Sequence, residues 1–285
     1  MQTRRLTART RLAPTPPVLL LTGFEPFGGD SVNPSWEIAR RLDGWLVFAD
    51  GHHPEPEQGQ AASEVKLTDA SADTEEPGDG QRTPLAVVRA ALLPCVFHGA
   101  LAVLDHEIAR HRPIAIIGLG LAASRQDISV ERVAINIDDA RIPDNAGRRP
   151  IDEPVCPGAP AAYWSTLPIK AIVAALGEAG IPASVSQSAG TFVCNHVFFG
   201  LAHRLARRRR RPPVAAAGEQ TLSGRSPEVA RGGFIHVPWP ADQEGLPPAT
   251  ACGIDLQMMT EAVRIAIRVT LTTSSDLRAP GGALD

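Results

Sequence analysis

The most informative segment of this chain is Val18-Leu-Leu-Leu-Thr22, a short run of large apolar residues that ends in Thr22 and stops at Gly23. A run this short and this apolar is typical of a strand buried on both faces. Such strands occur in parallel sheets that helices cover on each side. Asn33 then caps a predicted helix over residues 34–42. A buried strand followed by a helix is the beginning of a βαβ unit.

The same alternation continues toward the C-terminus. It predicts further strands over residues 85–97, with a break at Pro94, and over 114–118, 133–137, 183–188 and 233–237. It predicts further helices over residues 99–110, 168–179, 195–207 and 254–271. Strands that alternate with helices indicate an α/β protein. We therefore expect one domain over residues 17–275, an α/β/α sandwich with a twisted, mostly parallel sheet.

Two stretches interrupt this pattern, and we predict both to be disordered insertions. Residues 51–84 carry eight acidic residues against Lys66 and Arg82, and almost no large apolar side chain. Residues 207–231 open with five arginines, Arg207 to Arg211, and then show no periodicity. The arginine run is either an anion-binding patch or a solvated helix end that complements the helix dipole, and the second interpretation is favoured. A basic leader over 1–16 and a tail over 276–285 are also predicted to be disordered.

The composition excludes several classes of protein. The 285 residues include 28 Lys and Arg against 31 Asp and Glu, a net charge of −3, so no basic field favours nucleic acid or an anionic membrane. No window approaches the roughly 18 apolar residues of a membrane span, and the basic leader precedes an apolar run too short for a signal peptide. Four scattered cysteines show no zinc-ligand spacing. These features predict a reduced, cytoplasmic protein without a metal site.

Cys194 is the candidate nucleophile, because it stands where a predicted strand turns into a predicted helix that begins near Asn195. The N–H groups and positive dipole end of a helix favour thiolate over thiol, and the same groups stabilise an oxyanion. The alternative, a small apolar residue packed at a tight turn, stays equally open. Cys95 lies in an apolar segment and is predicted to be buried and inert, whereas Cys156 lies in a proline-rich loop and is predicted to be structural or incidental.

A nucleophilic cysteine needs a base and a group that orients the base. His236 ends the predicted strand 233–237, at the strand end where open α/β sheets gather site residues, although a satisfied core histidine is the alternative. Glu131 directly precedes the predicted strand 133–137, where it either orients the base or is a surface carboxylate paired with Arg132 or Arg125. For His196 and His203, a capping or packing role is expected.

At these residues the chain resembles the pyroglutamyl peptidase I family, cysteine peptidases that remove pyroglutamate from peptide N-termini. The resemblance spans most of residues 17–272 outside the two insertions, and makes residues 17–275 the peptidase domain. It rests on three blocks: Thr22-Gly-Phe-Glu-Pro-Phe-Gly-Gly29 with Asn33-Pro-Ser-Trp36, then Gly120 to Asn136 leading into Asp139 to Asn145, and Ser186 to His196.

The resemblance implies roles for individual residues. Cys194 would be the nucleophile, His236 the general base and then acid, and Glu131 the carboxylate that orients His236. Arg141 and the backbone N–H of Cys194 would face the developing oxyanion, with no metal or cofactor required. The residues that match the family's pyroglutamyl pocket are Phe24, Phe27, Ile142, Phe192 and Val193. A neutral lactam ring buries well against such side chains, whereas a charged free glutamate does not.

The chain departs from the family at a few positions near these residues. The family commonly has Gly-Gly-Arg where this chain has Ala123-Ser124-Arg125, and often a glutamine where Leu121 stands. These changes would alter the pocket wall without touching the three catalytic positions. The resemblance also implies a homo-oligomer, a tetramer.

Two other functions remain open from the sequence. One is a thiol amidase that acts on another small lactam or amide. The other is a non-catalytic pyroglutamyl-binding protein, although the presence of all three candidate catalytic residues argues against lost turnover. The sequence does not indicate which residue is preferred after pyroglutamate.

Overall fold

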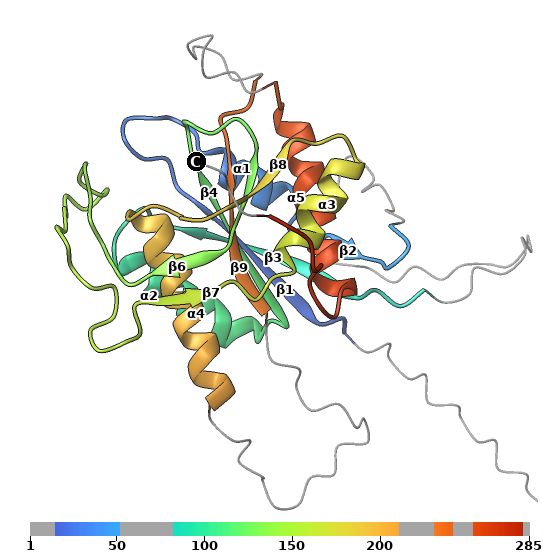
Figure 1. The fold of residues 1–285 in the computed structure, drawn as a ribbon, viewed down its shortest axis with the longest axis horizontal. Helices are drawn as coiled ribbons and strands as arrows, with labels where there is room; N and C mark the ends of the chain where they lie inside the picture. Colours follow the sequence, from blue (N-terminus) through green and yellow to red (C-terminus); the bar gives the residue numbers. More distant parts are fainter. Residues whose placement is uncertain (1–14, 52–81, 211–230, 242–252, 282–285) are drawn as a thin grey trace, which may run out of the picture.

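A seven-stranded sheet forms the centre of the computed structural model, which describes residues 15–51, 82–210, 231–241 and 253–281. The strand order is β2-β3-β1-β4-β9-β5-β8, and helices cover both faces of the sheet (Figure 1). This arrangement confirms the predicted α/β fold. The predictions of disorder for residues 1–14, 52–81, 211–230 and 282–285 lie outside the described residues, as does Cys252.

Most of the expected elements are present, with small shifts at their ends. The helices are α1 (Pro34–Arg41), α2 (Gly99–His111), α3 (Ile169–Glu178), α4 (Val193–Arg210) and α5 (Leu256–Thr272). The strands are β1 (Val18–Phe24), β2 (Leu46–Val47), β3 (Ala86–Leu93), β4 (Ala115–Leu121), β5 (Ile128–Glu131), β6 (Val133–Ile135), β7 (Ala162–Trp164), β8 (Ala183–Ser186) and β9 (Arg231–Val237). Sequence periodicity does not predict β2, β5 or β7, because two to four residues are too few to show it.

The sheet is mostly parallel, and its strands alternate their side chains between two cores. β1 pairs in parallel with β3 and β4, and β4 with β9, whereas β5 runs antiparallel to β9. Leu19 and Leu21 belong to the core under α1, α3 and α5, and Leu20 to the core under α2 and α4. Both faces of β1 are therefore buried, which explains why its sequence is apolar except at Thr22.

An ion pair joins two residues at the ends of the first insertion, and the second insertion is shorter than predicted. An ion pair of 3.4 Å between Asp50 and Arg82 joins the two ends of the first. α4 continues to Arg210, and β9 begins at Arg231, so residues 207–210 and Arg231 belong to regular structure. Arg207, Arg208 and Arg209 lie in the last turn of α4, where positive charge complements the negative end of the helix dipole.

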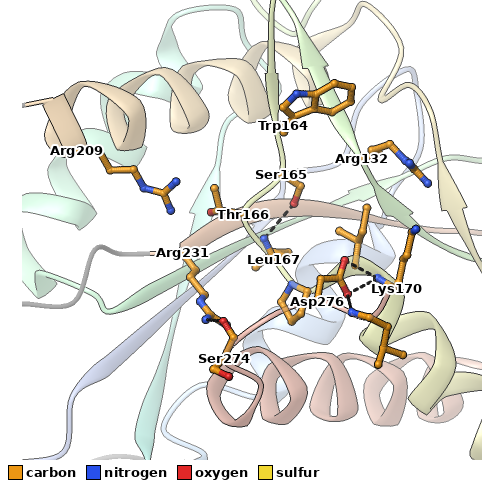
Figure 2. A pocket seen from close by; sticks show the side chains of 13 residues that line it. Arg132, Trp164, Ser165, Thr166, Leu167, Lys170, Arg209, Arg231, Ser274 and Asp276 are labelled. Atoms are coloured by element: carbon orange, nitrogen blue, oxygen red, sulfur yellow. Dashed lines mark hydrogen bonds between the residues drawn. The ribbon is translucent and has the colours of Figure 1, made fainter. Parts of the chain in front are cut away.

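The C-terminal segment packs on the domain instead of forming a disordered tail from residue 276. The carboxylate of Asp276 accepts hydrogen bonds from the N–H groups of Lys170, at 3.0 Å, and Ala171, at 2.9 Å, in the first turn of α3. These contacts line a hollow of about 620 Å³ (Figure 2). The boundary predicted at residue 275 is therefore wrong, because the contacts that fix this segment join residues more than 100 positions apart.

The basic side chains around this hollow hold the same segment. Arg132 donates to the carbonyl of Gly281 at 2.7 Å, Lys170 donates to the carbonyl of Ala279, and Arg231 donates to the carbonyls of Thr273 and Ser274. The cations thus bind backbone oxygens after α5. Their role is to attach the end of the chain to the body of the domain.

Candidate active site

The sheet face that α4 covers carries two of the three candidate catalytic side chains. Successive residues of a strand point to opposite faces. In β9, Ile235 and Val237 belong to the core under α1, α3 and α5, so Phe234 and His236 face α4. In β5, Val130 belongs to that same far core, so Glu131 also faces α4. The antiparallel pairing of β5 with β9 then brings Glu131 beside His236.

Glu131 and His236 form a buried hydrogen-bonded pair, to which Arg125 adds a charge. His236 Nδ1 lies 2.8 Å from Glu131 Oε1, and Arg125 Nη1 donates to the same oxygen at 2.6 Å. Glu131 is 0% and His236 4% exposed. Glu131 lies just before β6, as expected, and is itself the last residue of β5. Its surface-carboxylate interpretation is wrong, because the pairing with Arg125 occurs in the interior.

The charges around this pair set the protonation state of both groups. Burial alone would raise the pKa of Glu131, but the hydrogen bond to His236 and the charges of His236 and Arg125 outweigh it, so the pKa is lowered. Burial lowers the pKa of His236, and Glu131 offsets this effect only in part. Glu131 is thus ionised and His236 neutral, with Nδ1–H donating to Glu131 and the Nε2 lone pair left free.

Cys194 occupies the first turn of α4, which starts at Val193, slightly before the predicted start near Asn195. Gly120 of β4 makes room for the thiol. A Cβ atom at residue 120 would lie 2.8 Å from Cys194 Sγ and 2.8 Å from Cε1 of Phe234. Gly120 is also the register partner of His236. The thiol therefore lies above the sheet at the level of the histidine, although no hydrogen bond between the two is present in the described residues.

Burial raises the pKa of the Cys194 thiol well above its ordinary value, and the nearby Cys95 and Glu131 raise it further. Arg125 and the backbone N–H group at the start of α4 lower this pKa, but by less. The start of the helix thus acts in the expected direction, because its N–H group lowers the thiol pKa, but desolvation of the thiol outweighs this effect. Both pKa shifts favour a thiol and a neutral imidazole in the resting pair.

The contact between position 120 and the thiol leads to a prediction, for which Gly118→Ala is the matched control. Gly120→Ala should lower kcat/KM by about a hundredfold or more, because its Cβ displaces Cys194 Sγ. At Gly118, a Cβ would lie 2.6 Å from the Phe234 ring, and Cys194 is not among its nearest atoms. Both variants should lose about 1–3 kcal/mol of stability through overpacking. Thermal unfolding and kcat/KM of the folded fraction separate the two effects, and equal activity losses would refute this role of Gly120.

Asn195 fixes the start of α4 against β6. Its Nδ2 donates to the carbonyls of Ile135, at 2.9 Å, and Ile137, at 3.0 Å, and its Oδ1 accepts the N–H of Ile135 at 3.0 Å. Asn195 is fully buried. Asn195 thus positions the start of α4 and the candidate nucleophile before it, and its place directly after Cys194 is the signal that the sequence offered.

His196 is a buried structural histidine, as the sequence predicted. Its Nδ1 lies 2.7 Å from Asp138 Oδ2, and its Nε2 accepts the backbone N–H of His98 at 3.0 Å. Both ring nitrogens are therefore engaged, and the ring is 0% exposed. A histidine in this state is no base for the neighbouring thiol.

Aromatic side chains gather beside the thiol. The ring of Phe192 lies 6.1 Å from that of Phe27 and makes an edge contact of 5.4 Å with Phe97, a residue outside the pocket predicted from the sequence. Phe24 is 2% exposed and Val193 0%, so these two residues lie beneath the surface. Phe27 and Phe192 are half-buried and have apolar surface available for a ligand.

The other predicted positions lie further toward solvent. Ile142 is 45% exposed, and Arg141 is also exposed, with no hydrogen bond or ion pair to Cys194 among the described residues. Ala123 and Ser124 are exposed in the turn between β4 and β5, whereas Leu121 is buried at the end of β4.

Cys95 behaves as predicted. It is 3% exposed, and burial, together with the carboxylates of Glu25 and Asp144, raises its pKa to about 12. Such a thiol stays protonated and inert.

The family model described as pyroglutamyl peptidase matches residues 18–51 and 63–273. The chain belongs to the pyroglutamyl peptidase family. It is 44% identical over 265 residues to a pyrrolidone-carboxylate peptidase of Klebsiella pneumoniae, which covers 93% of this chain and 98% of the relative. The solved pyroglutamyl peptidase I of Bacillus amyloliquefaciens is 36% identical with a TM-score of 0.67, over 93% of this chain and 100% of that one.

A second solved structure extends this similarity to an archaeal relative. The pyrrolidone carboxyl peptidase of Thermococcus litoralis is 32% identical with a TM-score of 0.67, and the match covers 93% of this chain and 99% of that one. In the part of the chain that the structure describes, no helix is long and apolar enough to cross a membrane. Within the same residues, no group of three or more His, Cys, Asp or Glu residues could hold a metal ion.

Proposed function

We propose that this protein is a cysteine peptidase that removes pyroglutamate from the N-terminus of peptides. The observation that carries the proposal is the placement of Cys194 in the first turn of α4, above the sheet face where Glu131 holds His236. Membership of the pyroglutamyl peptidase family supports the substrate class. The relatives at 41–44% identity are named pyrrolidone-carboxylate peptidases.

Acylation begins when substrate brings the scissile carbonyl to Cys194. The resting thiol and neutral imidazole favour proton transfer during the attack: the Cys194 proton passes to Nε2 of His236 as Sγ bonds to the carbonyl carbon. Glu131 stabilises the imidazolium through Nδ1–H, at the 2.8 Å contact already present. Because Arg125 shares the same carboxylate oxygen, Glu131 stays ionised throughout.

Breakdown of the tetrahedral intermediate uses the same groups in reverse. The backbone N–H of Cys194, at the start of α4, faces the developing oxyanion, and we assign Arg141 as a second donor that approaches when substrate binds. His236 then protonates the leaving amine, and the C–N bond breaks to leave a thioester on Cys194. Water, deprotonated by His236, hydrolyses the thioester and releases free pyroglutamate.

The aromatic side chains beside the thiol explain the preference for a neutral ring. Phe27 and Phe192 offer apolar faces to the lactam, Phe24 and Val193 support them from below, and Ile142 closes the outer wall. A charged amine or carboxylate at the same place would lose its hydration without gaining a partner. Discrimination of this kind reaches several orders of magnitude when buried polar groups are left unpaired.

A substrate panel tests this function. Hydrolysis of a fluorogenic pyroglutamyl amide is compared with that of the matching prolyl and glutaminyl amides, with and without a thiol-alkylating reagent. The prolyl amide keeps the five-membered ring but carries a charged amine and no lactam carbonyl. We expect kcat/KM for the pyroglutamyl amide to be at least about a hundredfold higher than for either control. Equal rates would instead support a general thiol amidase, and no turnover a binding protein.

The pH dependence of kcat/KM provides a test of the charges around His236. Its lowered pKa places the acidic limb of the profile below the ordinary value for histidine, because only neutral His236 accepts the thiol proton. Arg125 lowers this pKa and Glu131 raises it. Arg125→Gln should therefore move the acidic limb to higher pH, and Glu131→Gln to lower pH. Shifts in the same direction would contradict this assignment of charges.

Two predictions concern the oligomeric state and the cellular location of the protein. We propose the homo-oligomer that the family resemblance implies, a tetramer, and a cytoplasmic location. Trp164 and Ile151 are each 70% exposed, which supports further burial of surface in an assembly. Light scattering coupled to gel filtration measures the mass, and a monomer at micromolar concentration would contradict the first proposal.

A further inference from the structure

A second cluster of thiol, imidazole and phenol lies away from the active site. Cys156 Sγ is 3.8 Å from His203 Nε2, and Tyr163 Oη is 2.8 Å from His203 Nδ1. His203 stands nine residues after Cys194 on α4, roughly 13 Å further along the helix axis. The cluster therefore belongs to another part of the surface and takes no part in peptide hydrolysis.

The contacts of His203 prepare its Nε2 to accept a proton. When Nδ1–H donates to Tyr163 Oη, the lone pair of Nε2 points toward the Cys156 thiol. Partial burial lowers the pKa of His203, and the charges of Arg207 and Arg204 lower it further, so the ring is neutral near pH 7. Phe199 stacks on this ring at 6.3 Å, which holds its orientation.

The thiol itself is held in place through its backbone. Asn136 Oδ1 accepts the N–H of Cys156 at 2.9 Å, and Asn136 Nδ2 donates to the carbonyl of Cys156 at 3.0 Å. Cys156 is only partly buried. Unlike Cys95, this thiol is both fixed beside a base and open to reagents.

Arginine side chains surround the mouth of the cluster. Cys156 and His203 line a hollow of about 460 Å³ together with Arg204, Arg207 and Arg208 of α4. Arg204 pairs with Asp105, whereas Arg207 and Arg208 are exposed and form no ion pair within the described residues. Two cations beside a thiol favour a reagent that carries carboxylates.

We propose that Cys156 is a second reactive thiol, which forms mixed disulfides with anionic low-molecular-weight disulfides of the glutathione type. The Cys156 proton passes to His203 Nε2, and the thiolate attacks one sulfur of the disulfide. The S–S bond of the reagent breaks, a new S–S bond joins Cys156 to one half, and the other half leaves as a thiolate. Cys156 is oxidised and the leaving half reduced, so the disulfide itself is the oxidant. Arg207 and Arg208 bind the carboxylates of the reagent.

The experiment uses the full chain with Cys194→Ser and Cys252→Ser, so that Cys156 and the buried Cys95 are the remaining thiols. Second-order rates are measured with two chromogenic disulfides, the dianionic dithiobis(nitrobenzoate) and the neutral dithiodipyridine, and compared with an uncharged cysteine peptide. We expect the ratio of anionic to neutral rates to be at least about tenfold higher for Cys156 than for the peptide. Mass spectrometry should find glutathione disulfide adducts on Cys156.

Two sets of variants separate the roles of charge and base. Arg207→Gln with Arg208→Gln should return the ratio toward that of the peptide while the neutral reagent reacts at its former rate. His203→Gln should slow both reagents by at least about tenfold and keep the ratio. Tyr163→Phe removes only the hydroxyl and should slow the anionic and the neutral reagent in equal proportion. This variant tests the base if His203→Gln fails to fold. A ratio equal to that of the peptide, or rates that survive loss of both His203 and the Tyr163 hydroxyl, would overturn the proposal.

Discussion

Cys194→Ser should lower kcat/KM for a pyroglutamyl amide by roughly four orders of magnitude or more, with the fold unchanged. Serine fits the space that Gly120 leaves for the thiol, so packing is conserved. Its hydroxyl is far less acidic than a thiol, and burial at this position raises even the thiol pKa. His236, whose own pKa is lowered, is too weak a base to compensate. Steady-state kinetics with far-UV circular dichroism as a folding control measure the effect.

Alkylation gives an independent check on the same residue. Loss of activity with iodoacetamide should follow labelling of Cys194, site by site in peptide mass spectra. Cys156→Ser is the matched control, because it removes a partly exposed thiol outside the site and should leave both turnover and the inactivation rate unchanged. Inactivation that follows Cys95, Cys156 or Cys252 would sink the assignment of the nucleophile.

The elements that the sequence predicted are those with long, strong local patterns. β1 is almost entirely apolar because both of its faces are buried, and α1 carries a capping asparagine that accepts the N–H of Ser35. β5 has four residues and takes its direction from pairing with β8 and β9, a tertiary property with no local signal. The docking of the C-terminal segment depends likewise on Asp276, whose partners lie over 100 residues away.

In the candidate site, too, local features could be predicted from the sequence and long-range contacts could not. Position at a strand end indicated His236, and position at a helix start indicated Cys194, while family resemblance supplied the roles. The contacts that tune these groups join distant residues: Glu131 lies 105 positions from His236, and Asp138 lies 58 from His196. Gly120 acts through its missing side chain, which has no signature in a single sequence. The helix start that lowers the pKa of the Cys194 thiol is visible in the sequence, whereas the desolvation that raises this pKa is not.

His236→Ala should approach the loss of Cys194→Ser, because it removes both the acceptor of the thiol proton and the acid for the leaving amine. Two other histidines, His203 and His196, lie on α4 and serve as controls. His203→Gln changes a residue outside the site and should leave kcat/KM unchanged, whereas His196→Asn should lower stability but keep the activity of the folded fraction within about tenfold. Near-parental activity in His236→Ala would mean that another group is the base.

Glu131→Gln should lower kcat/KM by about two to four orders of magnitude, and still leave roughly tenfold to a hundredfold more activity than His236→Ala. Both His236 and Arg125 bind Oε1 of Glu131, so an amide oxygen can take over both contacts. What the amide lacks is the charge that stabilises the imidazolium. Since residues that act as one unit are not additive, Cys194→Ser with Glu131→Gln should be no slower than Cys194→Ser alone. A double variant whose losses multiply would show that Glu131 acts independently of the thiol and not through His236.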